Sequence, residues 1–101
     1  MSVTYKCTAR RMAGGQGHEH ISQLWWVKVV DRKETTTTGV STRQEMVEYI
    51  NKHGPNSVWC PDRNPNGKSA WVHVHNNGRI EYVQTVADGR KTDNLLSLPE
   101  R

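Results

Sequence analysis

The sequence has no phenylalanine, and only two of its 101 residues are cysteine. Cys7 and Cys60 are too few for the disulfide framework of a small secreted domain, and no Cys-x-x-Cys motif occurs. No apolar run approaches membrane-spanning length, and the first residues, MSVTYKC, lack the apolar stretch of a secretory signal. We therefore expect a cytoplasmic protein that keeps its thiols reduced and does not contact a membrane.

The motifs of common enzyme classes are also missing. There is no Gly-x-Ser-x-Gly, no P-loop and no dinucleotide fingerprint. The glycine-rich stretch AGGQG, residues 13–17, lacks the Lys-Ser/Thr pair that a phosphate-binding loop needs, and it predicts a flexible loop. Cys7 falls on a predicted apolar strand face, where a thiol acts as a small hydrophobe, and Cys60 precedes Pro61 at a strand end. The sequence therefore favours a protein without catalytic residues and without a cofactor.

The composition is that of one modest globular domain spanning residues 1–101. Hydrophobic residues make up 34% of the chain, and four tryptophans and three tyrosines can contribute large buried areas. Fourteen Lys and Arg against ten Asp and Glu give a net charge of +4. This charge permits contact with nucleic acid or with an acidic protein but requires neither, because the basic residues are spread along the chain.

Alternating residues predict two strands in the first third of the chain. The first is VTYKCTARRM at Val3–Met12, and the second is ISQLWWVKVVD at Ile21–Asp31. Trp25 and Trp26 are adjacent, so in a strand they point to opposite faces. One of them can join the core, and the other must be covered by another group or exposed. The following RKETTTTG is interpreted as a polar connection that extends the edge of the strand.

The clearest helix signal covers about residues 42–53. Thr42 with Glu45, or Ser41 with Gln44, has the spacing of a capping box. A Gly-Pro pair follows the segment and ends it. The helix is short, so it must pack on a sheet through one apolar face. That face is formed by Met46, Val47 and Ile50.

Three further strands are predicted in the C-terminal half, with Asn-Gly, Asn-Asn-Gly and Asp-Gly turns between apolar segments. These strands are SVWC (57–60), SAWVHVH (69–75) and RIEYVQTV (79–86). The order ββαβββ predicts an α+β domain in which one helix packs against an antiparallel sheet of about five strands. The last segment is apolar enough to dock on this domain through Leu95, Leu96 and Leu98.

Two stretches resemble a known family. They are HEHI at 18–21, just before the tryptophan-containing strand, and YVQTVADGRKTDNLLSLPE at 82–100. Together with the helix TRQEMVEYI and the strand WVHV, they make the chain resemble the small bacterial and bacteriophage proteins of domain-of-unknown-function family DUF3892. The resemblance implies an intracellular single-domain protein of bacterial or phage origin and implies no catalytic residues. HEHI belongs to this pattern, whereas His73 and His75 do not.

Four histidines are candidate metal ligands. His73 and His75 share a strand face about 6.6 Å apart, and His18 and His20 could add ligands from the glycine-rich loop. With Glu19, the set would suit zinc or nickel better than calcium. A His-x-His pair is nevertheless a weak motif, and the loop would lose conformational entropy on binding.

A second interpretation needs no metal. His20 can tie down its own loop by hydrogen bonding to a carbonyl or carboxylate. His73, His75 and Trp71 then form a polar strand face, opposite a core-facing row of Ala70, Val72 and Val74.

Two surfaces are candidates for recognition. One contains Trp71, His73 and His75, and the other contains Trp25 or Trp26. Lys6 and Arg10 lie on the outer face of the first strand and could add basic side chains to a sheet face that carries Trp71, His73 and His75. Tryptophan and arginine are favoured anchors at protein interfaces, and such a face can also stack unpaired bases. Our leading hypothesis is a non-catalytic cytoplasmic module that binds a protein partner, for example as a phage accessory protein acting on a host factor. The alternatives are a single-stranded nucleic-acid-binding domain and a small histidine-dependent metal protein or enzyme.

Overall fold

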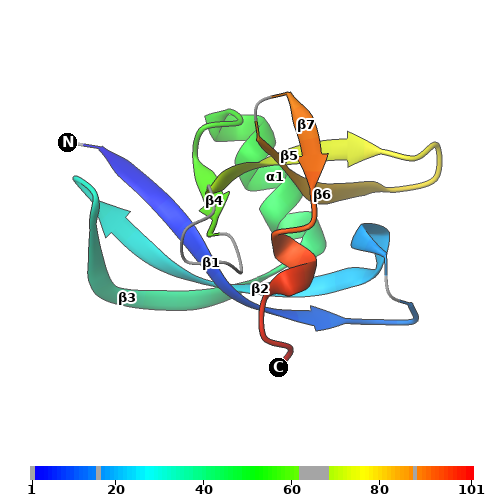
Figure 1. Cartoon of the computed structure of the whole chain (residues 1–101), viewed down its shortest axis with the longest axis horizontal. Helices are drawn as coiled ribbons and strands as arrows, with labels where there is room; N and C mark the ends of the chain where they lie inside the picture. The colour runs from blue at the N-terminus through cyan, green and yellow to red at the C-terminus, as the bar shows by residue number, and fades with distance from the viewer. Residues whose placement is uncertain (1, 16, 62–68, 88) are drawn as a thin grey trace.

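The computed structural model describes residues 2–15, 17–61, 69–87 and 89–101 (Figure 1). The predicted turn at residues 66–67 lies outside these ranges. One α-helix, α1 (Arg43–His53), is accompanied by two short 3-10 helices, η1 (His18–His20) and η2 (Leu95–Ser97). The strands are β1 (Val3–Met12), β2 (Ile21–Val30), β3 (Lys33–Thr42), β4 (Val58–Cys60), β5 (Ala70–Asn76), β6 (Glu81–Ala87) and β7 (Arg90–Thr92).

The strands form one seven-stranded sheet in the order β3-β2-β1-β4-β5-β6-β7. Neighbouring strands are antiparallel, except that β1 and β4 are parallel. The prediction of an α+β domain with one helix on a sheet is therefore confirmed. The prediction of about five antiparallel strands in the order ββαβββ was wrong, because the sheet is mixed and the order is βββαββββ.

The two additional strands arise from segments interpreted as connections. The threonine-rich segment after β2 turns back at Asp31 and Arg32, whose φ values of 50° and 69° suit a tight hairpin, and it pairs with β2 as β3. β-branched threonines favour this extended conformation. Near the C-terminus, residues after Gly89 pair with β6 as β7. Both strands lie at an edge of the sheet and are polar in composition. Their sequences therefore resemble loops, which is why they were not predicted as strands.

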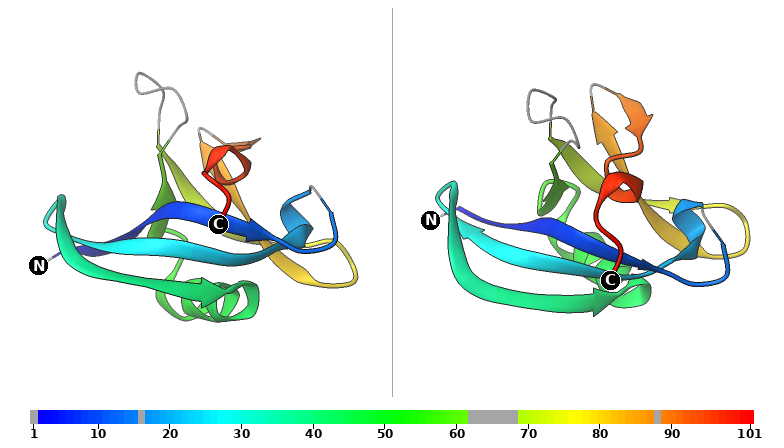
Figure 2. Two further views of the ribbon diagram at one scale, coloured as in Figure 1. Left: turned by 90° about the horizontal axis from the view of Figure 1, so that it is seen from below. Right: turned by 60° about the horizontal axis from the view of Figure 1, so that its bottom comes forward.

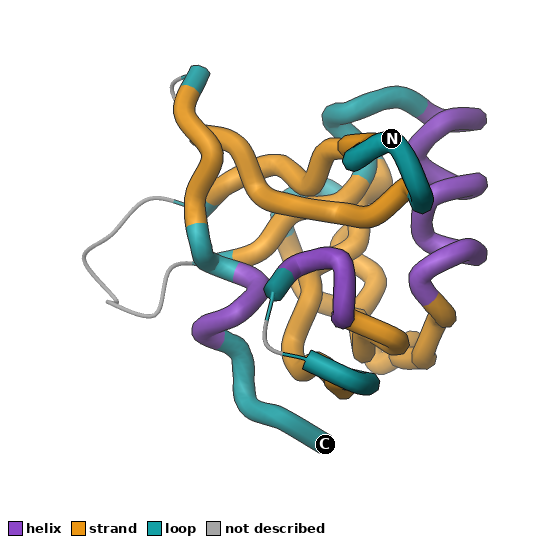
Figure 3. Tube along the Cα trace, turned by 90° about the vertical axis from the view of Figure 1, so that its right-hand side faces the viewer, coloured by secondary structure: helices purple, strands orange, loops and turns teal. Residues whose placement is uncertain are grey.

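The sheet is strongly curved, so that β1–β3 and β5–β7 form two arms set at a steep angle (Figure 2). Helix α1 runs along one side of the strands, and η2 with the C-terminal segment lies on another side (Figure 3). None of the helices in the described ranges is long and apolar enough to span a membrane. Both arms, α1 and η2 contribute to the core, which contains Cys7, Ile21, Leu24, Met46, Val47, Ile50, Val58, Cys60, Val72, Val83, Leu95 and Leu98.

Helix α1 begins at a capping box, and the structure selects one of the two predicted alternatives. The Glu45 backbone N–H donates to Thr42 Oγ1 at 3.2 Å, and the Thr42 N–H donates to Glu45 Oε1 at 2.9 Å. Hydrogen bonding of the Glu45 carboxylate by Thr42, first by its backbone N–H and then by its side chain, lowers the pKa of Glu45. The predicted apolar face of Met46, Val47 and Ile50 is buried, as expected. The cap thus fixes where the helix starts and which residues enter the core.

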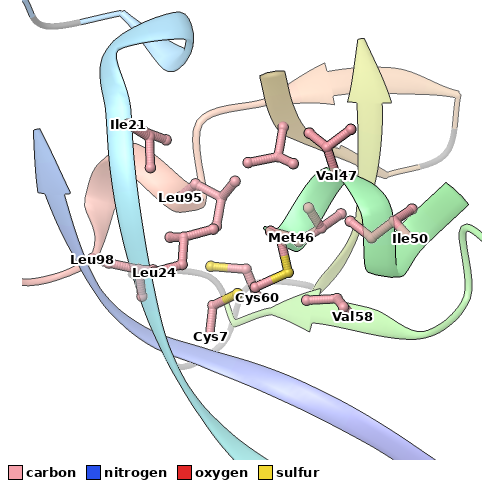
Figure 4. Close-up of a cluster of buried hydrophobic side chains, with 12 residues drawn as sticks. Cys7, Ile21, Leu24, Met46, Val47, Ile50, Val58, Cys60, Leu95 and Leu98 are labelled. Atoms are coloured by element: carbon pink, nitrogen blue, oxygen red, sulfur yellow. The ribbon is translucent and has the colours of Figure 1, made fainter. Parts of the chain in front are cut away.

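The C-terminal segment docks on β1, as its leucines predicted. Leu95 is fully buried and Leu98 is 8% exposed, and Figure 4 shows Leu95 pointing into the core cluster. The backbone of Arg10 secures the segment, because its N–H donates to the Pro99 carbonyl at 2.9 Å and its carbonyl accepts from the Arg101 N–H at 2.8 Å. β4 pairs with β1 only at Tyr5 and Lys6, which leaves this part of the β1 edge to the C-terminal segment.

Candidate binding site

Two tryptophans lie directly opposite each other on the face of the sheet that points away from the core. Trp59 of β4 pairs with Trp71 of β5, and both alternate with buried neighbours such as Cys60 and Ala70. Trp59 is half-buried, whereas Trp71 remains 37% exposed. Trp71 and Val40 are the only exposed large hydrophobic residues in the described part of the chain. The cross-strand pair of Trp59 and Trp71 is therefore a distinctive surface feature.

An open pocket of about 530 Å³ lies beside this pair. Val29, only 5% exposed, contributes an apolar wall, and Arg32 contributes a cation from the hairpin between β2 and β3. The described lining residues include no Asp or Glu. The full described lining is Ser2, Thr4, Val29, Arg32, Trp59, Ser69, Ala70 and Trp71, and we call it the tryptophan pocket.

Neighbouring strands hold Trp59 in place. Its indole Nε1–H donates to Thr4 Oγ1 of β1 at 3.1 Å. The Lys6 ammonium lies 5.8 Å from the centre of the Trp59 ring, within cation–π range, and also pairs with Glu34 at 3.2 Å. Contacts with β1 therefore hold one wall of the tryptophan pocket in place, whereas the Trp71 side chain is the more exposed of the two.

Comparison with known proteins gives the chain a family. The model of the family described as "Protein of unknown function (DUF3892)" matches residues 6–99. The chain belongs to the DUF3892 family. No curated protein and no solved structure matches it. The family match spans Trp59, Trp71 and all the site residues predicted from the sequence, but the family description assigns none of them a role.

The structure separates the aromatic and basic candidates of this DUF3892 member. Trp71 lines the tryptophan pocket, but Trp26 lies on the opposite face, packed against the core. Trp25 is covered by the guanidinium groups of Arg11 and Arg101, 5.3 and 5.0 Å from its ring centre. One of the adjacent tryptophans thus packs against the core, as predicted, and of the two alternatives left open for the other the structure shows the covered one.

Arg10 has a structural role at the C-terminal segment. Its side-chain Nε and Nη2 donate to the Leu96 carbonyl at 3.2 and 2.9 Å, and Nη1 lies 3.5 Å from Glu100. Lys6 is engaged with Glu34 and Trp59. Both basic candidates on β1 therefore have internal partners, and neither lines the tryptophan pocket.

His73 and His75 point away from the core on the same strand as Trp71, but they do not line the tryptophan pocket. His75 stacks on Tyr82 with ring centres 5.7 Å apart, and its buried Nε2 has no hydrogen-bond partner in the described chain. Burial lowers the pKa of His75, and the charges of Lys91, His73 and His18 add to this shift.

The loop histidines lie beyond β1. His18 is 8% exposed, and its Nε2 lies 3.9 Å from Asp93 without a hydrogen bond. The His20 ring lies against Gly15, where an added Cβ would collide with it, and Nε2 is 3.7 Å from Glu19. The predicted hydrogen bond from the His20 ring is not among the hydrogen bonds of the described residues. The loop is held instead by the backbone hydrogen bonds of His20 to Ala13 and Gly17, and by Arg43 Nη1, which donates to the Glu19 carbonyl at 2.7 Å. Among the described residues, no three His, Cys, Asp or Glu side chains are grouped to hold a metal, so the metal hypothesis stays a prediction without geometric support.

The buried imidazole of His18 predicts a loss of stability in acid. Burial lowers its pKa, although Asp93 and Glu19 oppose the shift. Because the unfolded chain then binds a proton at a higher pH than the native protein does, unfolding is favoured as pH falls below about 6.5. We expect the free energy of unfolding, measured by urea titration, to fall between pH 7.5 and pH 5.

The variant His18→Gln should flatten this pH dependence, with His75 supplying the part that remains. His53→Gln, which replaces an exposed imidazole by the same side chain, is the matched control with which the slope of His18→Gln is compared. If His18→Gln leaves the pH dependence of the free energy of unfolding unchanged, groups other than His18 cause the acid sensitivity.

Sequence patterns did not single out Trp59 or Arg32, which complete the tryptophan pocket. The pattern of SVWC contained a signal for Trp59, because apolar Val58 and Cys60 flank it and an alternating strand must point it outward. Arg32 carried no comparable signal. Its position depends on the β2–β3 hairpin, whose second strand was interpreted as a connection.

Proposed function

We propose that this DUF3892 member is a non-catalytic module that binds a protein partner, with an acidic peptide segment of the partner seated in the tryptophan pocket. The observation that carries the proposal is the cross-strand pair of Trp59 and Trp71 beside an open pocket. Tryptophan at the centre of such a pocket buries a large apolar area at a small entropic cost, which is why it dominates many protein interfaces.

The charge at the tryptophan pocket supports an acidic partner. Arg32 is the charged side chain among the described lining residues, which include no Asp or Glu. The chain as a whole carries a net charge of +4. A peptide that places an aromatic or aliphatic side chain against Trp71 and a carboxylate near Arg32 would satisfy both features.

The basic side chains of β1 support a protein partner over single-stranded nucleic acid. Lys6 pairs with Glu34, Arg10 with Glu100, and Arg11 lies over Trp25. Phosphate binding depends on several cations that can each replace a condensed counterion, and these three are already engaged. The proposal places the module in the cytoplasm of a bacterium or a phage-infected cell.

Selection from a displayed library of random peptides tests the proposal even though the partner is unidentified. We expect the enriched peptides to combine an aromatic or aliphatic residue with Asp or Glu. Trp71→Ala should weaken their binding at least about tenfold, as expected for a central anchor. Arg32→Asn should weaken it less and reduce its salt dependence; asparagine tolerates the positive φ at this position.

Val40→Ala is the matched control, because Val40 is the other exposed large hydrophobic residue in the described chain and lies outside the pocket. It should leave binding unchanged. The proposal fails if no sequence-specific peptide is enriched, or if Trp71→Ala binds the selected peptides as well as the wild type does. Oligonucleotide binding that weakens steeply with salt would instead favour the nucleic-acid alternative.

A further inference from the structure

A second pocket lies on the helix side of the sheet and is built from aromatic rings on three elements. Tyr5 of β1 stands edge-on to Trp26 of β2, with ring centres 5.0 Å apart and planes at 80°. It stands in the same way to Tyr49 of α1, at 5.3 Å and 87°. The pocket beside these rings has a volume of about 160 Å³, and its described lining is Tyr5, Trp26, Ser41, Glu45, Met46, Tyr49 and Val58.

The walls of this pocket are held in place before any ligand arrives. The Trp26 Nε1–H donates to Ser41 Oγ at 3.0 Å, and the indole ring lies directly over Gly39 of β3. A Cβ at Gly39 would lie only 2.5 Å from Trp26 Cζ2, so the absence of a side chain there allows the ring its position. Tyr49 is backed by the His53 ring at 4.2 Å. Such preorganisation reduces the entropic cost of binding.

Among the described residues, one carboxylate and no cation line the pocket. Glu45 Oε1 accepts the capping hydrogen bond from the Thr42 N–H, and this bond lowers the pKa of Glu45. The carboxylate is therefore charged at neutral pH. The cation–π contacts within the described chain are made over Trp25 and Trp59. No Lys or Arg of the described chain lines the pocket, so the negative faces of its rings have no internal cation.

We propose that Tyr5, Trp26 and Tyr49, with Glu45 at the rim, form an aromatic cage that binds a methylated ammonium group. When fully methylated, such a group has no N–H to donate to a carboxylate, and its positive charge is surrounded by methyl groups. Aromatic faces attract its diffuse charge while the methyl groups fill the apolar space. The Tyr5 ring is nearly perpendicular to the rings of Trp26 and Tyr49, so the walls face in different directions. Glu45 supplies the charge that complements the ligand.

This inference is independent of the tryptophan pocket, which lies on the other face of the sheet. The group can come from a small quaternary ammonium compound such as choline or from a methylated lysine side chain in a peptide. Both sources present the same chemistry to the cage. Choline and a short trimethyllysine peptide are therefore the two ligands tested.

The test is a titration of the full chain followed through the NMR signal of the Trp26 indole N–H. We expect choline or the trimethyllysine peptide to shift this signal saturably. 3,3-Dimethylbutanol has the shape of choline without its charge, and an unmethylated lysine peptide lacks the methyl groups; both should bind at least about tenfold more weakly. The ligand with the higher affinity identifies the source of the methylated ammonium group.

Two variants probe the cage and one serves as control. Glu45→Gln removes the charge but keeps a residue suited to the capping box, and Tyr49→Leu removes a ring but keeps an apolar side chain. Each should weaken binding about tenfold, whereas Trp71→Ala should not. The proposal is overturned if neither cationic ligand moves the Trp26 signal, or if the neutral isostere of choline binds as tightly as choline does.

Discussion

Replacing Leu95 by alanine is expected to lower the free energy of unfolding by about 2–5 kcal/mol, a large part of the stability of a domain this size. Leu95 is fully buried, although it lies in a one-turn 3-10 helix near the C-terminus, and it points into the core between the two arms of the sheet (Figure 4). The alanine variant leaves a cavity that neither arm can close. Urea denaturation followed by circular dichroism measures the change.

Leu96→Ala is the matched control, since the neighbouring residue has the same side chain but is only half-buried. Leu96→Ala should lower the free energy of unfolding clearly less than Leu95→Ala does. Equal costs would mean that the C-terminal segment is stabilised by its general contact with β1, through the backbone hydrogen bonds of Arg10, rather than by insertion of Leu95 into the core.

Replacing Gly39 by alanine is expected to destabilise the protein by about 1–3 kcal/mol, the usual cost of overpacking. Glycine in a strand normally weakens it, so this substitution would stabilise an ordinary position. Here the added Cβ meets Trp26 Cζ2 at 2.5 Å and Cη2 at 2.8 Å. The Trp26 ring is also held by Tyr5 and Ser41, so it cannot move without losing contacts.

A double-mutant cycle with Trp26→Leu isolates this collision from other effects. In the Trp26→Leu background the indole is gone, so Gly39→Ala should be neutral or slightly stabilising. An equal loss of stability in both backgrounds would show that Gly39 is required for the backbone of β3 rather than for the ring above it. Chemical denaturation of the four proteins supplies the cycle.

The sequence predicted the elements that have strong local signals. The capping box and the apolar face predicted helix α1. The turn signal between two alternating segments predicted β5 and β6. The sequence did not predict β3 or β7, because exposed polar edge strands resemble loops in composition. The parallel pairing of β1 with β4 joins segments more than fifty residues apart along the chain, so no local pattern marks it.

The candidate sites were only partly visible in the sequence for the same reason. Trp71 stood out, since strand alternation points it away from the core. Its partner Trp59 becomes relevant only once β4 and β5 are known to pair, and Arg32 only once β3 folds back on β2. The cage depends on three elements meeting, and nothing in the sequence links Tyr5, Trp26 and Tyr49.

The most direct test of the proposed function is to observe all four tryptophan indole N–H signals by NMR while a library-selected acidic peptide is added. The described structure places Trp59 and Trp71 at the tryptophan pocket, Trp25 beneath two arginines and Trp26 in the aromatic cage. We predict that the signals of Trp59 and Trp71 shift saturably and that those of Trp25 and Trp26 stay in place. Shifts confined to Trp25 or Trp26 would contradict the proposal and place recognition on another surface.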